Sequence, residues 1–331
     1  MKNRTWIYVA AGVAAAALPF AIAGASTFQL TQMIGIAIAL IGLNVFVGWV
    51  GQPSLAQGAM FALGAYVTAM LCGIGVPWWL ALPVSAVTVA AFAWLLAVPL
   101  LRLSHSYLAL STFALALAIP QVLRHGSLSP WTGGATGLQL ERPKAPSWVP
   151  AELGSDAWMY WVALAIAVLL TVVLAKILAG RRGLELRSVR DNAIAAAAHG
   201  VHVSRVKEVA FAFSGLCAAL GGGLYALNVQ YVSPDSFGVF LSLTMLVALV
   251  VGGPASTVGP WIGAAFILYV PAWAERVSTA APWAIFGFSV LVIVFLAPGG
   301  LAGAGQALAQ RWRSRTKPAP TPGPCIESRP S

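Results

Sequence analysis

The longest polar run inside the chain, residues 181–208, interrupts a series of apolar segments that each approach the length of a membrane span. It reads RRGLELRSVRDNAIAAAAHGVHVSRVKE and carries six Lys or Arg side chains, which a bilayer core would reject. The whole chain is 59% hydrophobic and 8% charged, with a mean hydropathy of +0.84. This is the composition of an integral membrane protein, so the run must lie outside the bilayer.

The apolar segments predict an all-α polytopic membrane protein with about ten spans, since roughly 20 residues cross the hydrocarbon core. They are residues 6–24, 28–48, 54–74, 78–101, 106–123, 157–178, 208–228, 239–252, 260–274 and 282–297. The first resembles a signal peptide at Ala21-Ile22-Ala23, but a retained span is favoured. The eighth and ninth are short enough to be re-entrant.

The distribution of positive charge predicts the orientation of these spans. Only Arg124, Arg142, Lys144 and Arg276, four of the 19 Lys and Arg residues, fall on the outer side of the alternating map. Basic loops stay in the cytoplasm, so both termini and the loop of about 180–208 are predicted there. The same map explains the net charge of +10 without nucleic acid. Residues 1–300 form the predicted membrane domain, and residues 301–331 a disordered, basic, Pro-rich cytoplasmic tail.

The uncharged centre of the cytoplasmic loop predicts a short helix. Asp191 is a suitable N-cap, Ala195–Ala198 favour helix, and Gly200 suits the left-handed position after a helix. So short a helix is stable only when it is docked. It either packs under its own bundle or meets a partner.

Two Gly/Pro patterns suggest duplicated halves. Gly51, Pro53 and Gly58 recur 201 positions later as Gly252, Pro254 and Gly259. Breaks at matching places in two halves are typical of discontinuous helices that line a transport path. Gly and Pro also gather at the ends of ordinary spans, which is the alternative.

The chain offers no chemistry for catalysis or for proton coupling. It contains no phosphate-binding loop, no nucleophile elbow and no zinc-protease motif, and its three cysteines are widely separated. We therefore expect no enzyme activity, no metal and no cofactor. The deep apolar positions lack the charged side chains of a proton relay, although sodium coupling through backbone carbonyls stays open.

Weakly polar side chains and glycines near the breaks are the candidates for a translocation path. Such groups can bind a small zwitterion, and they can equally bind neighbouring helices. The candidates are Asn44, Gln52, Ser54, Gln57, Gly58, Tyr107, Ser111, Thr112, Gly252 and Gly253.

Several motifs resemble the LivM-type permeases of branched-chain amino-acid ABC importers. They are GLNVFVGWVGQ at 42–52, SLAQG at 54–58, TGGATGL at 132–138, RDNAIA at 190–195 and YVSPDSF at 231–237. The resemblance extends from about residue 30 to 298. It implies a multi-pass subunit of the bacterial inner membrane that pairs with a second, LivH-type permease, two ABC ATPase subunits and an extracytoplasmic binding protein.

The resemblance also implies roles for particular residues. The short helix would fit a groove on the ATPase, with Arg190, Asp191, Asn192, Ala195, Ala196 and Gly200 at the contact. Ile194 occupies the position that is acidic in ABC importers generally, which removes a salt bridge there. The binding-protein side would include Gly133, Gly134, Thr136, Gly137, Pro234 and Asp235. Thr136 replaces an acidic residue of some relatives.

The sequence thus predicts an importer permease that moves branched-chain or related hydrophobic amino acids inward, energised by separate ATPase subunits. Related permeases carry urea, short amides and other amino acids, so the substrate stays open. The alternatives are a self-contained facilitator or ion-coupled carrier, and a membrane scaffold.

Overall fold

The computed structural model describes residues 19, 24–103, 105–143, 154–277, 282–297 and 299–305. The predicted first span lies almost entirely outside the described residues, and so do residues 306–331 of the predicted tail.

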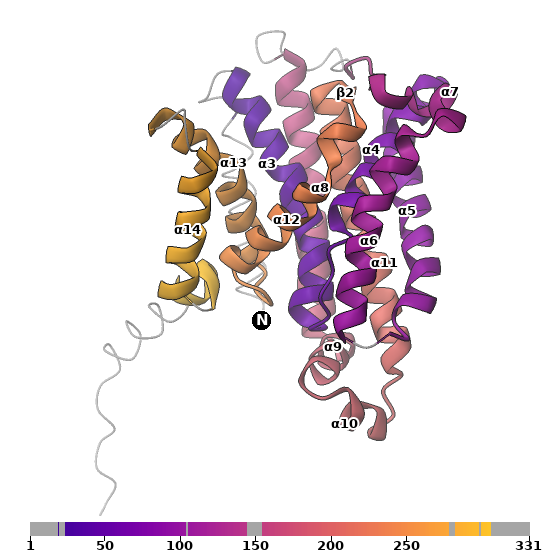
Figure 1. The fold of residues 1–331 in the computed structure, drawn as a ribbon. Coiled ribbons are helices and arrows are strands. Elements are labelled where there is room, and N and C mark those ends of the chain that lie inside the picture. Colours follow the sequence, from indigo (N-terminus) through magenta and orange to yellow (C-terminus); the bar gives the residue numbers. More distant parts are fainter. Residues whose placement is uncertain are drawn as a thin grey trace, which may run out of the picture.

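Helices account for nearly all of the described chain (Figure 1). The long ones are α3 (Gly24–Leu43), α4 (Gln57–Gly73), α5 (Trp78–Leu100), α6 (His105–Arg124), α8 (Gly154–Ala179), α11 (Val203–Val229), α12 (Val239–Gly252), α13 (Gly259–Val277) and α14 (Pro282–Leu296). A π-helical segment, η1 (Asn44–Trp49), prolongs α3. Each predicted span from residue 28 onward coincides with one of these helices.

Seven stretches of the described chain are long and apolar enough to cross a membrane, and α4 is a shorter apolar helix. The stretches are Ser26–Trp49, Trp78–Leu100, Tyr107–Arg124, Ser155–Ala179, Val203–Val229, Pro234–Gly252 and Pro282–Gly305. The chain is therefore a multi-pass α-helical membrane protein. The count of ten spans stays a prediction, as does the duplication of the halves.

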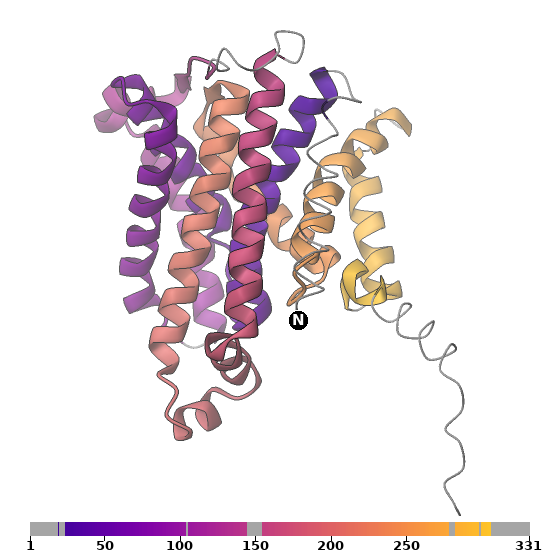
Figure 2. The same ribbon diagram turned by 180° about the vertical axis from the view of Figure 1, so that it is seen from behind.

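The centre of the bundle is α11, which packs against α3, α4 and α5 and runs its full length (Figure 2). Small residues allow this packing. A Cβ on Gly222 would lie 2.0 Å from the carbonyl oxygen of Phe61, and one on Gly64 would lie 2.2 Å from the Cα of Ala219. Such close backbone contact replaces the hydrophobic driving force that lipid does not supply.

The two ends of the bundle carry different structures (Figure 1). One end bears α9 (Arg181–Asp191) and α10 (Ala193–Ala198), and is called the basic end here. The opposite end bears η2 (Gly126–Leu128), α7 (Ser129–Thr132), η3 (Gly134–Thr136), η4 (Pro234–Phe237) and two short strands. Strands β1 (Leu138–Gln139) and β2 (Tyr231–Val232) pair antiparallel, with Leu138 opposite Val232.

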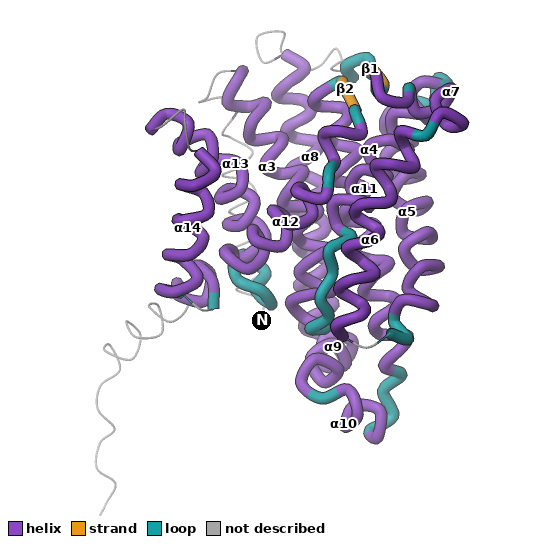
Figure 3. The backbone as a smooth tube through the Cα atoms, viewed as in Figure 1, coloured by secondary structure: helices purple, strands orange, loops and turns teal. Residues whose placement is uncertain are grey.

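Two non-helical connections interrupt the bundle. The first, residues 50–56, joins η1 to α4 and runs beside α6 (Figure 3). The second, residues 253–258, joins α12 to α13. They are called the first and second interruptions below.

Candidate functional site at the helix interruptions

The loop at the basic end folds into two helices rather than one. Residues from Arg181 through Asp191 form α9, and Asn192 is the N-cap of α10. The Asn192 Oδ1 accepts hydrogen bonds from the N–H groups of Ile194 and Ala195, each at 3.0 Å. The prediction that Asp191 caps this helix is therefore wrong, because Asp191 completes the preceding helix. Gly200 adopts the predicted left-handed conformation, with φ +81°.

The helix α10 projects beyond the bundle and has an open surface (Figure 1). Only Ala196 is buried, whereas Ala195 is exposed and Ile194 is 85% exposed. This geometry disfavours the alternative in which the short helix packs under its own bundle. Its apolar surface is available to a partner.

The neighbouring helix α9 contacts the end of η1 and the start of the first interruption. The Arg187 guanidinium carbon lies 4.9 Å from the ring centroid of Trp49, a cation–π contact. A Cβ on Gly51 would lie 3.0 Å from the Arg190 Cγ, so the Arg190 side chain packs directly on Gly51. Sequence reasoning missed the Arg187–Trp49 contact, because no spacing rule links residues so far apart.

Polar side chains from four helices hold the first interruption and the start of α4. Gln57 Nε2 donates to the Ala39 carbonyl at 2.6 Å, and Gln57 Oε1 accepts from Ser214 Oγ at 2.8 Å. The Leu55 N–H donates to Thr112 Oγ1 at 3.1 Å. The Gly58 N–H donates to Ser242 Oγ at 3.1 Å.

Asn44 joins the second interruption to η1. Its Nδ2 donates to the Ser256 carbonyl at 2.7 Å, and its Oδ1 accepts from the Ala255 N–H at 2.8 Å. The side chain is fully buried. A Cβ on Gly48 would lie 2.5 Å from the Ala255 nitrogen, so this connection also packs directly on η1.

The predicted path residues therefore separate into three groups. Asn44, Ser54, Gln57, Gly58 and Thr112 are buried close to the first interruption or between the two. A second pair lies at the other connection, where Gly252 ends α12 and Gly253 has φ +105°.

The remaining path residues are more accessible. Tyr107 is 64% exposed on α6, and the Ser111 hydroxyl donates to the Tyr107 carbonyl at 2.8 Å. Gln52 is partly buried, and its N–H donates to the Phe46 carbonyl at 3.2 Å. The open face of α6 is thus the most exposed part of the predicted path.

The predicted binding-protein residues gather at the opposite end. The Tyr231 hydroxyl donates to the Thr136 carbonyl at 2.9 Å, and Arg124 forms an ion pair with Asp235. Gly133, Gly134 and Gly137 all have positive φ, which explains the glycines of that loop. Pro234 is buried in η4.

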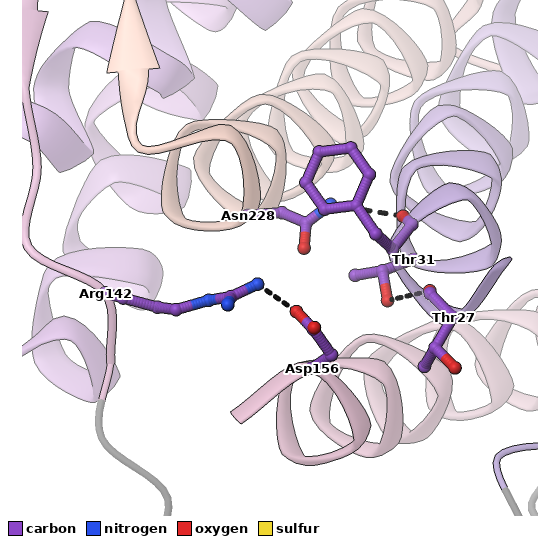
Figure 4. Close-up of polar contacts among 6 residues, drawn as sticks. Thr27, Thr31, Arg142, Asp156 and Asn228 are labelled. Atoms are coloured by element: carbon purple, nitrogen blue, oxygen red, sulfur yellow. Dashed lines mark hydrogen bonds and ion pairs between the residues drawn. The ribbon is translucent and has the colours of Figure 1, made fainter. Parts of the chain in front are cut away.

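Further polar contacts tie the helices together at this end (Figure 4). Asn228 of α11 donates to the Phe28 carbonyl of α3 at 3.3 Å, and Arg142 forms an ion pair with Asp156 of α8. The Tyr66 hydroxyl is one of several buried polar groups of the described residues that have no hydrogen-bond partner, and Asn228 Oδ1 is another. The Tyr66 ring packs edge-on against Phe237.

The described residues hold no cluster of three or more His, Cys, Asp or Glu side chains that could bind a metal ion. The thiols of Cys72 and Cys217 are both free.

A bundle of apolar helices broken at two connections is typical of membrane transport proteins. The chain belongs to the family described as branched-chain amino acid transport system / permease component, which matches residues 25–297. It is a LivM-type permease by sequence similarity.

Three curated relatives illustrate the similarity. The high-affinity branched-chain amino acid transport system permease protein LivM of Escherichia coli (strain K12) is 32% identical over 75% of this chain and 63% of its own length. LivM of Salmonella typhimurium (strain LT2) is 31% identical over 74% and 62%. The autoinducer 2 import system permease protein LsrC of Salmonella paratyphi B is 30% identical over 46% of each chain.

The chain thus spans somewhat less than two thirds of the length of the LivM proteins. No solved structure matches it.

Proposed function

We propose that the chain is the permease subunit of an ABC importer that moves a branched-chain or related hydrophobic amino acid into the cell. The observation that carries the proposal is the contact of α9 with Trp49 and Gly51. It connects an exposed docking loop to the first interruption, as a subunit driven by an external ATPase requires.

The proposed mechanism starts at α10. An ATPase subunit binds the open face around Ile194 and Ala195, and its closure displaces α10 together with α9. The displacement reaches η1 through the Arg187–Trp49 contact and then the first interruption, which leads into α4 at Gln57. Because Gln57 and Gly58 are held by Ser214 and Ser242, the motion spreads to α11 and α12.

The opposite end fits the delivery of substrate by a binding protein. Its turns are fixed to each other by the β1–β2 pairing and by the Tyr231–Thr136 hydrogen bond. A rigid surface of this kind suits docking with little loss of conformational entropy. The complete importer would contain a second permease, two ATPase subunits and the binding protein, with both termini of this chain in the cytoplasm.

The match to LivM, whose name specifies branched-chain amino acids, covers more of this chain than the match to LsrC, whose name specifies autoinducer 2. This difference supports an amino-acid substrate. The alternative of a self-contained or ion-coupled carrier has less support. The buried polar side chains of the described residues are all uncharged, so they supply no proton relay.

Reconstitution tests the proposal directly. The chain is placed in proteoliposomes with its candidate partner permease and ATPases, and liganded binding protein is added. We expect leucine uptake and faster ATP hydrolysis, and no response when the binding protein carries no ligand. Equal leucine uptake by this chain alone, without ATP, would instead favour a facilitator.

Gly200 tests the docking of α10 separately. Gly200→Val forces a β-branched residue into a left-handed conformation at a cost of about 1 to 2 kcal/mol, although nothing lies within 4 Å of the added Cβ. We expect ATP hydrolysis without matching uptake. Gly200→Asn is the control, because Asn tolerates this conformation, and it should keep the wild-type ratio of uptake to hydrolysis. Normal coupling in a normally assembled Gly200→Val importer would contradict the docking.

A further inference from the structure

A hollow of about 340 Å³ lies between α8, α9, α11 and η1 at the basic end, and none of the predicted path residues lines it. One part of its lining is apolar and the other is charged. Leu174, Ile177, Val209 and Phe213 supply apolar surface, and Arg182, Glu185 and Arg205 supply the charges. The hollow is therefore amphipathic, like the boundary of a bilayer.

The position of each part matches the depth of a membrane leaflet. Leu174 and Ile177 belong to the last two turns of the apolar span Ser155–Ala179, and Phe213 lies inside the span Val203–Val229. Arg182 and Glu185 lie on α9, beyond the first of these spans. The apolar lining thus faces hydrocarbon while the charged lining faces the headgroup region. Val209 leaves 60% of its surface open at this boundary.

The charges of the hollow favour an anion. Arg182 lies in the first turn of α9 and Arg205 in the first turn of α11, and neither first turn contains an acidic residue. Helix N-termini carry partial positive charge, so cationic side chains there are unfavourable unless an anion compensates them. Within the described residues neither arginine forms an ion pair. The lining holds two guanidinium groups and one carboxylate, that of Glu185, so its net charge is positive.

We propose that this hollow binds an anionic phospholipid, whose phosphate contacts Arg182 and Arg205 and whose acyl chain lies along Leu174, Ile177, Val209 and Phe213. Basic pockets between transmembrane helices recognise lipid headgroups in this way. A soluble anion would use the arginines alone. A water-soluble protein could not reach the apolar lining at hydrocarbon depth. The site does not depend on the substrate or on the transport cycle.

Native mass spectrometry of the full chain tests the lipid directly. The protein is released from nanodiscs that contain equal amounts of phosphatidylglycerol and phosphatidylcholine, and the retained lipid is identified. The wild-type chain should retain phosphatidylglycerol over phosphatidylcholine by about tenfold or more. Equal retention of the two lipids by the wild-type chain would overturn the proposal, whatever the variants do.

Two variants separate the charged lining from the apolar one. Arg182→Gln/Arg205→Gln should lose the preference, whereas the matched control Arg102→Gln/Arg190→Gln, also at the basic end, should keep it. Val209→Trp fills the apolar mouth and should reduce lipid retention with both arginines present. If excess inorganic phosphate displaces the bound species and Val209→Trp has no effect, the site binds a free anion and the lipid assignment is wrong.

Discussion

The two interruptions begin alike and are held differently. Each has a glycine with positive φ at its first or second residue, with φ +76° at Gly51 and +105° at Gly253. The first interruption meets side chains: Arg190 packs on Gly51, and Thr112 accepts the Leu55 N–H. The second is held by the buried Asn44 side chain and also touches backbone directly, since a Cβ on Gly253 would lie 2.9 Å from the Gly299 carbonyl oxygen.

This difference separates a movable connection from a fixed one. Side chains change rotamer at low cost, whereas two backbones in contact cannot separate without shifting whole helices. The first interruption is also the one that α9 touches, through Trp49 and Gly51. We infer that the first interruption moves during transport and that the second is the anchor against which it moves.

The largest expected effect contrasts Gly252→Ala with Gly51→Ala. A Cβ on Gly252 would lie 2.1 Å from the Gly259 carbonyl oxygen, so α12 and α13 must move apart at a cost of about 3 kcal/mol. Gly51→Ala meets the flexible Arg190 side chain and should cost about 1 kcal/mol, mainly from its positive φ. Denaturant unfolding in mixed micelles measures both. The reverse order would remove the distinction between the two connections.

Asn44 gives the next effect. Asn44→Ala removes two short hydrogen bonds to the second interruption and leaves the Ala255 N–H and Ser256 carbonyl without their partner. The free energy of unfolding should fall by about 2 to 3 kcal/mol. Asn228→Ala is the matched control, because that buried amide donates one longer bond, at 3.3 Å, to Phe28. An equal loss in the two variants would mean that Asn44 does not anchor the connection.

The sequence predicted most of the fold because membrane helices follow from apolar length and charge position. The charge map placed residues 181–208 inside and Arg124 outside, and the resemblance put Pro234 and Asp235 on the same side as Gly133 and Gly137. The structure places residues 181–208 and this second group at opposite ends of the bundle. The sequence did not predict the Arg187–Trp49 contact or the cap at Asn192. The first depends on how α9 packs on η1, and the second on where α9 stops, which sequence fixes only to within one or two residues.

The candidate path shows the same limit. The sequence shows that Asn44, Gln57 and Thr112 are polar residues within or beside apolar segments, but it does not show their hydrogen-bond partners. Their partners lie far away in the chain: Ser214 for Gln57, Ser256 for Asn44 and Leu55 for Thr112. Until the packing is known, the sequence therefore does not show whether a buried polar side chain in such a bundle binds substrate or a neighbouring helix.

A smaller effect is expected at the contact between α9 and η1. Arg187→Gln removes a cation–π interaction of about 1 kcal/mol, so uptake per ATP hydrolysed should fall about fivefold in the reconstituted importer. Trp49→Leu should act alike, and Arg187→Lys should retain part of the coupling. Arg181→Gln, on the same helix, is the control. If Arg187→Gln lowers uptake and hydrolysis equally, the contact stabilises the fold and does not transmit motion.

The smallest effect tests whether the first interruption moves. Thr112→Val preserves shape but leaves the Leu55 N–H without its acceptor, which should lower the free energy of unfolding by about 1 kcal/mol. Ser111→Ala is the control, because that hydroxyl only donates to the Tyr107 carbonyl of its own helix and should contribute nearly nothing.

If the Leu55–Thr112 bond breaks in the transport cycle, Thr112→Val also destabilises the resting state relative to the moved state. Basal ATP hydrolysis should then rise while stability falls. A loss of stability with unchanged basal hydrolysis would show that this bond persists, and the first interruption would be as fixed as the second.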